Sequence, residues 1–122
     1  MTHEGITELV GEAHEVAFDK GFYEDIETTE RYLKEHGQHA LAHIAVRTFV
    51  LSQLALIGTE VSEAAQALRE KDVGSDELTT ELADVVIRVC DLAGYLGADL
   101  ERAIHKKMAV NRTRPRKHGR LC

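Results

Sequence analysis

The chain has 122 residues, 43% of them hydrophobic and 30% charged, with a formal net charge of −6. This length and mixture fit one globular domain and argue against global disorder. With one proline and no tryptophan, a strand-rich fold is disfavoured. No apolar run approaches the roughly 20 residues of a membrane span, and the acidic N-terminus lacks a signal core. Two cysteines form no disulfide framework, so we expect a cytoplasmic protein that does not enter membranes.

Charge is divided unevenly along the chain. Residues 1–101 carry seven Lys/Arg and 21 Asp/Glu, a net charge of −14. Residues 102–122 carry eight Lys/Arg and no acid, a net charge of +8. Such a basic end either binds an anionic partner or pairs with the acidic body.

The first predicted helix covers residues 2–20, where apolar residues recur at helical spacing. Gly21 is a suitable stop, because glycine readily adopts the left-handed conformation that ends helices. The following segment, residues 22–38, is polar and has few periodic anchors. We expect it to be a loop with at most one marginal helix.

A long helix is predicted over residues 40–70, and Gly58 interrupts its apolar stripe. That glycine indicates either a close backbone approach or a slight bend. Gly74 then marks a break, and Ser75 begins a new helix as its N-cap.

The next predicted helix, 77–96, ends at Gly97, and Asp99 can cap a last helix that reaches Arg112. Pro115 forbids its continuation. The chain is therefore expected to be all-α. We assign residues 1–115 to a single domain and 116–122 to a basic C-terminal tail.

Carboxylates stand out on the helix predicted at 77–96. Apolar residues cover most of its circumference, so we expect it to be largely buried. A narrow polar stripe nevertheless contains Glu81 and Asp84, which are neighbours at i and i+3. Asp91 extends this stripe, and we expect it to support the site or an interface, paired with Arg88.

The helix at 40–70 repeats this arrangement with Glu60 and Glu63, the only charges between Arg47 and Arg69. If the two helices pack antiparallel, four carboxylates converge and need protonation or a hard divalent cation. Oxygen ligands suit Mg²⁺, or Mn²⁺ as a substitute. The alternative is two solvated faces, but both pairs lie on helices otherwise too apolar for exposure.

The last predicted helix presents Lys107, Asn111 and Arg114 at i, i+4 and i+7, on one face. An ammonium, an amide and a guanidinium on one stripe make a suitable grip for phosphates. The alternatives are a solvated helix end and nucleic-acid binding. We do not expect the latter, because the chain is acidic overall and its tail lacks aromatic residues for base stacking.

These motifs, in this order, resemble the MazG-like all-α nucleotide pyrophosphohydrolases. The resemblance is carried by T-E-V-S-E-A at 59–64, E-L-A-D-V-V at 81–86 and K-M-A-V-N-R-T-R at 107–114. D-K-G-F-Y-E-D at 19–25 and L-G-A-D-L-E at 96–101 resemble the flanking segments of that family. The resemblance implies four-helix bundles assembled by homodimers or homotetramers.

The resemblance also implies an activity: Mg²⁺-dependent hydrolysis of (deoxy)nucleoside triphosphates to monophosphate and pyrophosphate, by cleavage of a phosphoric anhydride bond. The implied metal ligands and catalytic residues are Glu60, Glu63, Glu81 and Asp84. Lys107, Asn111 and Arg114 would contact phosphates, and Phe22 or Tyr23 would stack on the base. Two alternatives stay open: a pyrophosphohydrolase acting on another nucleotide metabolite, such as phosphoribosyl-ATP, and a non-catalytic helical oligomer whose basic tail binds a partner or nucleic acid.

Overall fold

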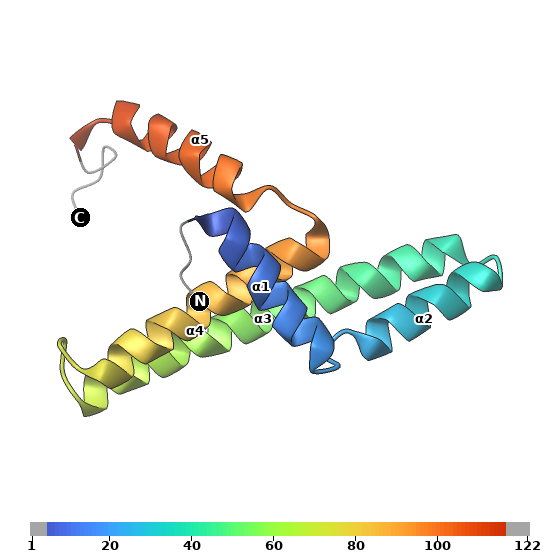
Figure 1. The fold of residues 1–122 in the computed structure, drawn as a ribbon, viewed down its shortest axis with the longest axis horizontal. Helices are drawn as coiled ribbons and strands as arrows, with labels where there is room; N and C mark the ends of the chain where they lie inside the picture. The colour runs from blue at the N-terminus through green and yellow to red at the C-terminus, as the bar shows by residue number, and fades with distance from the viewer. Residues whose placement is uncertain (1–4, 117–122) are drawn as a thin grey trace.

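A computed structural model of the chain describes residues 5–116, and this range contains five helices and no strand (Figure 1). The predicted all-α class is confirmed. The tail assigned to 116–122 lies outside the described residues except for Arg116. The helices are α1 (Ile6–Asp19), α2 (Glu24–Glu35), α3 (His39–Glu70), α4 (Asp76–Leu96) and α5 (Leu100–Thr113).

α3 and α4 lie side by side as an antiparallel hairpin, the longest unit of the fold (Figure 1). The predicted caps fix its ends. The Ser75 hydroxyl accepts the N–H of Leu78 at 3.1 Å, and Gly97 ends α4 in the left-handed region at φ 64°. Asp99 then accepts the N–H of Arg102 at 3.1 Å and begins α5.

α2 corrects the prediction of a loop with a marginal helix over residues 22–38. Acidic residues in its first turn and Lys34 in its last complement the helix dipole. Lys34 also pairs with Glu30, one turn away, at 3.1 Å. The decisive contribution is tertiary, since α2 packs on α3 and buries Ile26. One buried anchor suffices where a neighbouring helix provides the apolar surface.

α1 crosses α4 at a close approach that depends on Gly94. A Cβ built on Gly94 would lie 2.5 Å from the Cβ of His14. Gly58, for which a close approach or a bend was predicted, has nothing within 4 Å of such a Cβ and lies within an unbroken α3. The glycine that permits backbone contact is therefore on α4.

The core lies where α1, α2, α3 and α4 meet. Ala17, Tyr23 and Ile26 form its buried cluster, and Phe49 and Tyr95 pack against it. The Tyr23 and Tyr95 rings are stacked, with centroids 4.8 Å apart. Phe49 meets both rings edge-on. An aromatic group in a chain with so few aromatic residues thus holds the helices together.

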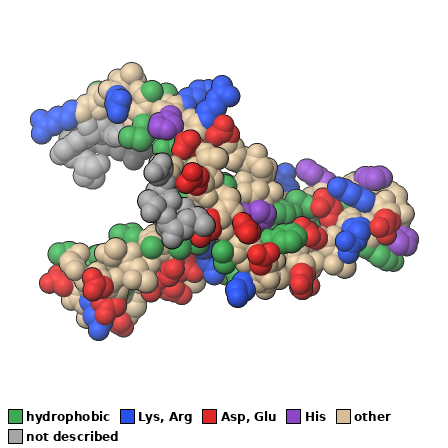
Figure 2. Space-filling model, viewed as in Figure 1, with side chains coloured by type: hydrophobic (Ala, Val, Ile, Leu, Met, Phe, Trp, Pro, Cys, Tyr) green, Lys and Arg blue, Asp and Glu red, His purple; other side chains and the backbone are tan. Residues whose placement is uncertain are grey.

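α5 projects from the rest of the molecule and is held mainly by α1 (Figure 1). Glu101, in its first turn, accepts the backbone N–H of Ile6 at 3.0 Å and the hydroxyl of Thr7 at 3.2 Å. Figure 2 shows the basic side chains of α5 on this arm, set apart from the acidic α3–α4 hairpin.

Much apolar surface stays uncovered in the single chain. In the single chain, the expectation that the helix at 77–96 is largely buried is wrong, because Leu82, Val86 and Ile87 are about half exposed. α1 and α3 are its main neighbours and cover only part of it. In α3, an 18-residue window has a mean hydropathy of 1.7 and is 6% buried. By length and composition alone, α3 could therefore cross a membrane, contrary to the expectation from apolar run length.

Candidate functional site

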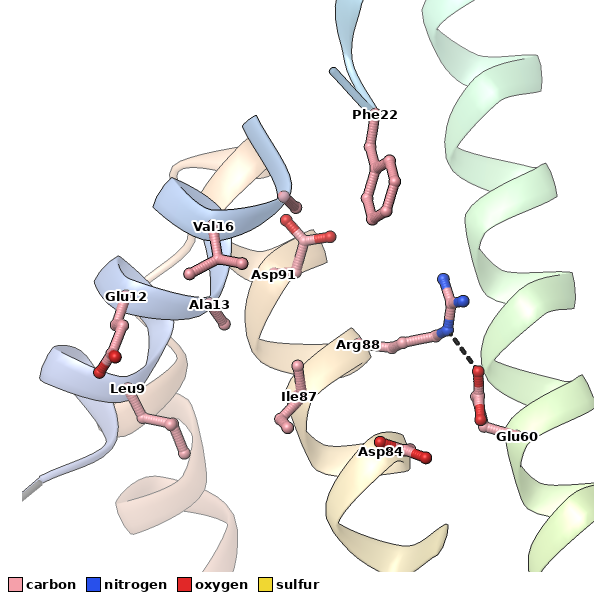
Figure 3. Close-up of a pocket in the computed structure, with 11 residues that line it drawn as sticks. Leu9, Glu12, Ala13, Val16, Phe22, Glu60, Asp84, Ile87, Arg88 and Asp91 are labelled. Carbon is pink, nitrogen blue, oxygen red and sulfur yellow. Dashed lines mark hydrogen bonds and ion pairs between the residues drawn. The ribbon is translucent and has the colours of Figure 1, made fainter. Parts of the chain in front are cut away.

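Three of the four predicted acids meet between α3 and α4. One carboxylate oxygen each from Glu60, Glu63 and Glu81 lies within 4.8 Å of the others. The spacing of three places Glu60 and Glu63 on one side of α3, and the antiparallel pairing brings Glu81 opposite them. Asp84, one turn along α4, points toward α3 beside Glu60 (Figure 3).

The acids repel one another. The charge of Glu60 raises the pKa of Glu63 above its ordinary value, and desolvation and the charges of Glu81 and Asp84 add to the rise. The Oε2 atom of Glu81 is inaccessible to solvent and has no hydrogen-bond partner. Repelling carboxylates with an orphaned buried oxygen are stabilised by a bound cation.

The donor set fits a hard cation. Within residues 5–116 the cluster offers carboxylate oxygens and neither imidazole nor thiolate, the pattern that suits Mg²⁺ or Mn²⁺ rather than Zn²⁺. Glu60, Glu63 and Glu81 are the residues that would hold such an ion, whereas Asp84 does not belong to the group whose ligand atoms meet.

A cavity of about 570 Å³ is lined by Glu60, one of the three clustered acids (Figure 3). This volume falls in the range of small-molecule sites. Its walls combine apolar side chains of α1 with Phe22 and with charged groups of α3 and α4. The lining residues are Leu9, Glu12, Ala13, Val16, Ala17, Phe22, Glu60, Asp84, Ile87, Arg88 and Asp91.

The four acids face two spaces. Glu60 and Asp84 line the cavity of about 570 Å³, whereas Glu63 and Glu81 line a smaller one of about 260 Å³. A ligand in the larger cavity would therefore meet the cluster at Glu60, with Asp84 in the same wall.

The two predicted base-stacking residues occupy different environments. Phe22 is 64% exposed and lines the larger cavity, so a planar ligand can reach it. Tyr23 is 2% exposed and stacks on Tyr95 in the core. Of these two residues, only Phe22 is accessible to a ligand in the larger cavity.

Asp91 belongs to a hydrogen-bond network that the sequence did not reveal. Its Oδ1 accepts the Tyr23 hydroxyl at 2.7 Å and lies 3.0 Å from Nδ1 of His14. Burial raises the pKa of Tyr23, and the hydrogen bond to Asp91 adds to the rise. The predicted pairing of Asp91 with Arg88 is wrong, because Nε of Arg88 instead bonds to Glu60 at 2.7 Å.

The predicted phosphate-binding residues lie away from the acids in the single chain. Lys107, Asn111 and Arg114 are exposed, and none of these three lines either of the two cavities described above. α5 packs mainly on α1, and no close packing of it on α3 is found within residues 5–116.

No protein-family model, curated protein or solved structure matches this chain.

Proposed function

We propose that this protein is a hydrolase that cleaves (deoxy)nucleoside triphosphates to monophosphate and pyrophosphate with Mg²⁺. The observation that carries the proposal is the convergence of Glu60, Glu63 and Glu81 beside a ligand-sized cavity. The ordered motifs that resemble MazG-like pyrophosphohydrolases support the same chemistry. The proposed nucleotide pyrophosphatase would belong to the hydrolases of phosphoric anhydride bonds.

Each group of residues has a separate role in the proposed reaction. A bound divalent cation would supply charge neutralisation at the phosphate oxygens. Glu60, Glu63 and Glu81 would hold the cation, and one carboxylate of the site would accept a proton from the water that attacks the α-phosphorus. The bond from that phosphorus to the pyrophosphate oxygen breaks, and pyrophosphate leaves. Phe22 lies against the base, at the apolar side of the cavity.

We propose that the functional form is a homodimer or homotetramer. The chain exposes 9308 Å², whereas a compact monomer of 13.6 kDa exposes about 6,600 Å². The difference exceeds the roughly 800 Å² per partner of a standard interface. Apolar α3, scarcely buried in its own chain, is the surface that a second copy would cover.

Such an assembly would also cover the apolar stripes and bring basic residues to the acidic cavity, neither of which the single chain does. Two α3–α4 hairpins packed together make a four-helix bundle with the apolar stripes inside. Within it, the basic face of one α5 (Lys107, Asn111 and Arg114) would complete the acidic cavity of a neighbouring copy. Because a second copy would cover the apolar surface of α3, we place the protein in the cytoplasm rather than in a membrane.

The activity is tested with a panel of canonical and modified (d)NTPs and phosphoribosyl-ATP, by pyrophosphate release with and without Mg²⁺. Glu60→Gln and Asp84→Asn should abolish release, and Glu15→Gln, an exposed acid of α1 outside both cavities, should retain it. Release only from phosphoribosyl-ATP favours the alternative substrate. Retention on DNA or RNA with no pyrophosphate formed contradicts the proposal and favours a non-catalytic oligomer.

The assembly is tested by the mass of the full chain in solution and by flotation with phospholipid vesicles. A mass of two or four chains and no flotation is expected. A monomer, or a chain that floats with vesicles, contradicts the proposed covering of α3 by a second copy.

A further inference from the structure

Arg88 joins α4 to α3 at the edge of the larger cavity. Its Nε donates to Oε1 of Glu60 at 2.7 Å, and the side chains are 37% and 13% exposed, respectively. Glu60 is at the same time one of the three clustered acids. One carboxylate is thus shared between a guanidinium and the candidate metal site.

The rest of the guanidinium is available to a ligand. Neither Nη atom forms a hydrogen bond or ion pair with any residue from 5 to 116, and both lie on the side toward Phe22 (Figure 3). Arg88 is the only Lys or Arg among the described residues that line this cavity. A planar fork of free N–H donors matches phosphate oxygens.

Arg88 pairs with Glu60 on the neighbouring helix and not with Asp84 on its own helix. Asp84 precedes Arg88 by four residues on α4, the favourable spacing for an ion pair within one helix. Arg88 instead reaches across to Glu60, which draws its positive charge to the clustered acids. There it offsets part of the repulsion among them.

We propose that Arg88 is a polyphosphate-binding residue whose availability is controlled by Glu60. In the metal-free protein Glu60 holds the guanidinium. When the Glu60 carboxylate turns to a divalent cation, Arg88 is released to bind phosphate oxygens in the adjoining cavity. Metal and polyphosphate therefore bind with positive coupling. The polyphosphate class of ligand rests on the proposed function, whereas the exchange of partners rests on the ion pair.

The experiment is isothermal titration of the full chain with inorganic tripolyphosphate, with Mg²⁺ alone, and with both. Arg88→Met should weaken binding of tripolyphosphate in saturating Mg²⁺ by roughly 10- to 100-fold, the effect of a lost charged hydrogen bond. The same variant should bind Mg²⁺ alone about two- to fivefold more tightly, because an ion pair no longer competes for Glu60. Arg88→Lys should keep the Mg²⁺ affinity of the wild type and recover part of the tripolyphosphate binding.

Glu60→Gln tests most directly whether Glu60 restrains Arg88 in the metal-free protein. It replaces the ion pair by a weaker contact to a neutral amide, so Arg88 is held less strongly without metal. The variant should therefore bind tripolyphosphate in the absence of Mg²⁺ more tightly than the wild type does, by roughly tenfold. Arg47→Met, which removes an exposed positive charge from α3 outside both cavities, is the matched control and should change none of these affinities.

Unchanged tripolyphosphate binding in Arg88→Met overturns the inference, as does metal-free binding by Glu60→Gln no tighter than that of the wild type. A purely structural ion pair would lower the melting temperature of Arg88→Met and leave both affinities alone. Pyrophosphate release by the wild type is scored separately. Release with no effect of Arg88→Met on binding refutes only this inference, whereas intact coupling without release from any nucleotide refutes only the proposed reaction.

Discussion

The hydroxyl of Tyr23 donates a 2.7 Å hydrogen bond to Oδ1 of Asp91, which ties the α1–α2 turn to α4. Phe22, the next residue back along the chain, lines the cavity, while Tyr23 itself is buried against Tyr95. The contact therefore fixes the turn that carries the exposed aromatic ring. Asp91 is held from a second direction by His14 of α1, at 3.0 Å.

Tyr23→Phe should lower the free energy of unfolding by about 1.5–3 kcal/mol, because a buried hydrogen bond to a carboxylate is lost. Chemical denaturation followed by circular dichroism measures this difference. Tyr32→Phe is the control, since Tyr32 is 59% exposed and should change stability by less than about 0.5 kcal/mol. Equal effects of the two substitutions would show that the Tyr23–Asp91 contact contributes nothing to stability.

Glu63→Gln should raise the melting temperature of the metal-free protein at neutral pH. The pKa of Glu63 is raised in the folded state, chiefly by Glu60, so the folded protein holds this proton more tightly than the unfolded chain. Stability then falls as pH rises through the interval between the unfolded and folded pKa values, and the cost persists above it. The gain from the substitution should therefore shrink in scans at progressively lower pH. A gain that is independent of pH argues against charge repulsion as its cause.

Mg²⁺ should raise the melting temperature of the wild type, since the cluster exists only in the folded state. At a Mg²⁺ concentration ten times the dissociation constant, the gain is about 1.4 kcal/mol. Glu81→Gln should abolish most of this gain, because its buried Oε2 has no other partner. Differential scanning calorimetry across millimolar Mg²⁺ provides the measurement. A flat melting temperature in the wild type would exclude a metal site here.

Gly94→Ala should destabilise the fold by about 1–3 kcal/mol, because the new methyl group overpacks the α1–α4 crossing. Its Cβ would meet His14 at 2.5 Å. Gly58→Ala is the matched control within α3, where nothing lies within 4 Å. That substitution should stabilise the protein by up to about 1 kcal/mol through helix propensity. If Gly94→Ala is as stable as the wild type, α1 does not cross α4 this closely.

Much of the helical framework could be predicted from the sequence, because local signals determine it. Ser75, Gly97 and Asp99 act at the helix ends where their chemistry places them. α2 was expected only as a marginal helix within a loop, because its stability comes from packing against α3, a contact that the spacing of residues within a polar segment does not reveal. The full burial expected for α4 was wrong for a related reason: an apolar pattern does not say which chain covers it.

The acids of the candidate site were predictable from the sequence, but the contacts that join its helices were not. Spacing on two helices predicts which acids share a side, and an antiparallel hairpin brings Glu60, Glu63 and Glu81 together. The partners of Arg88 and Asp91 were not predictable, because both join helices across the fold. Such contacts depend on the register and crossing of helices, which the sequence pattern leaves undetermined.

Glu101 accepts the first N–H of α1 from a position 95 residues further along the chain. Its carboxylate therefore serves as the cap that Gly5 does not provide. During synthesis the ribosome releases α1 long before residue 101 exists. Because α1 precedes α5 in the chain, the amino-terminal turn of α1 gains this hydrogen bond only after α5 has been synthesised and has packed against it.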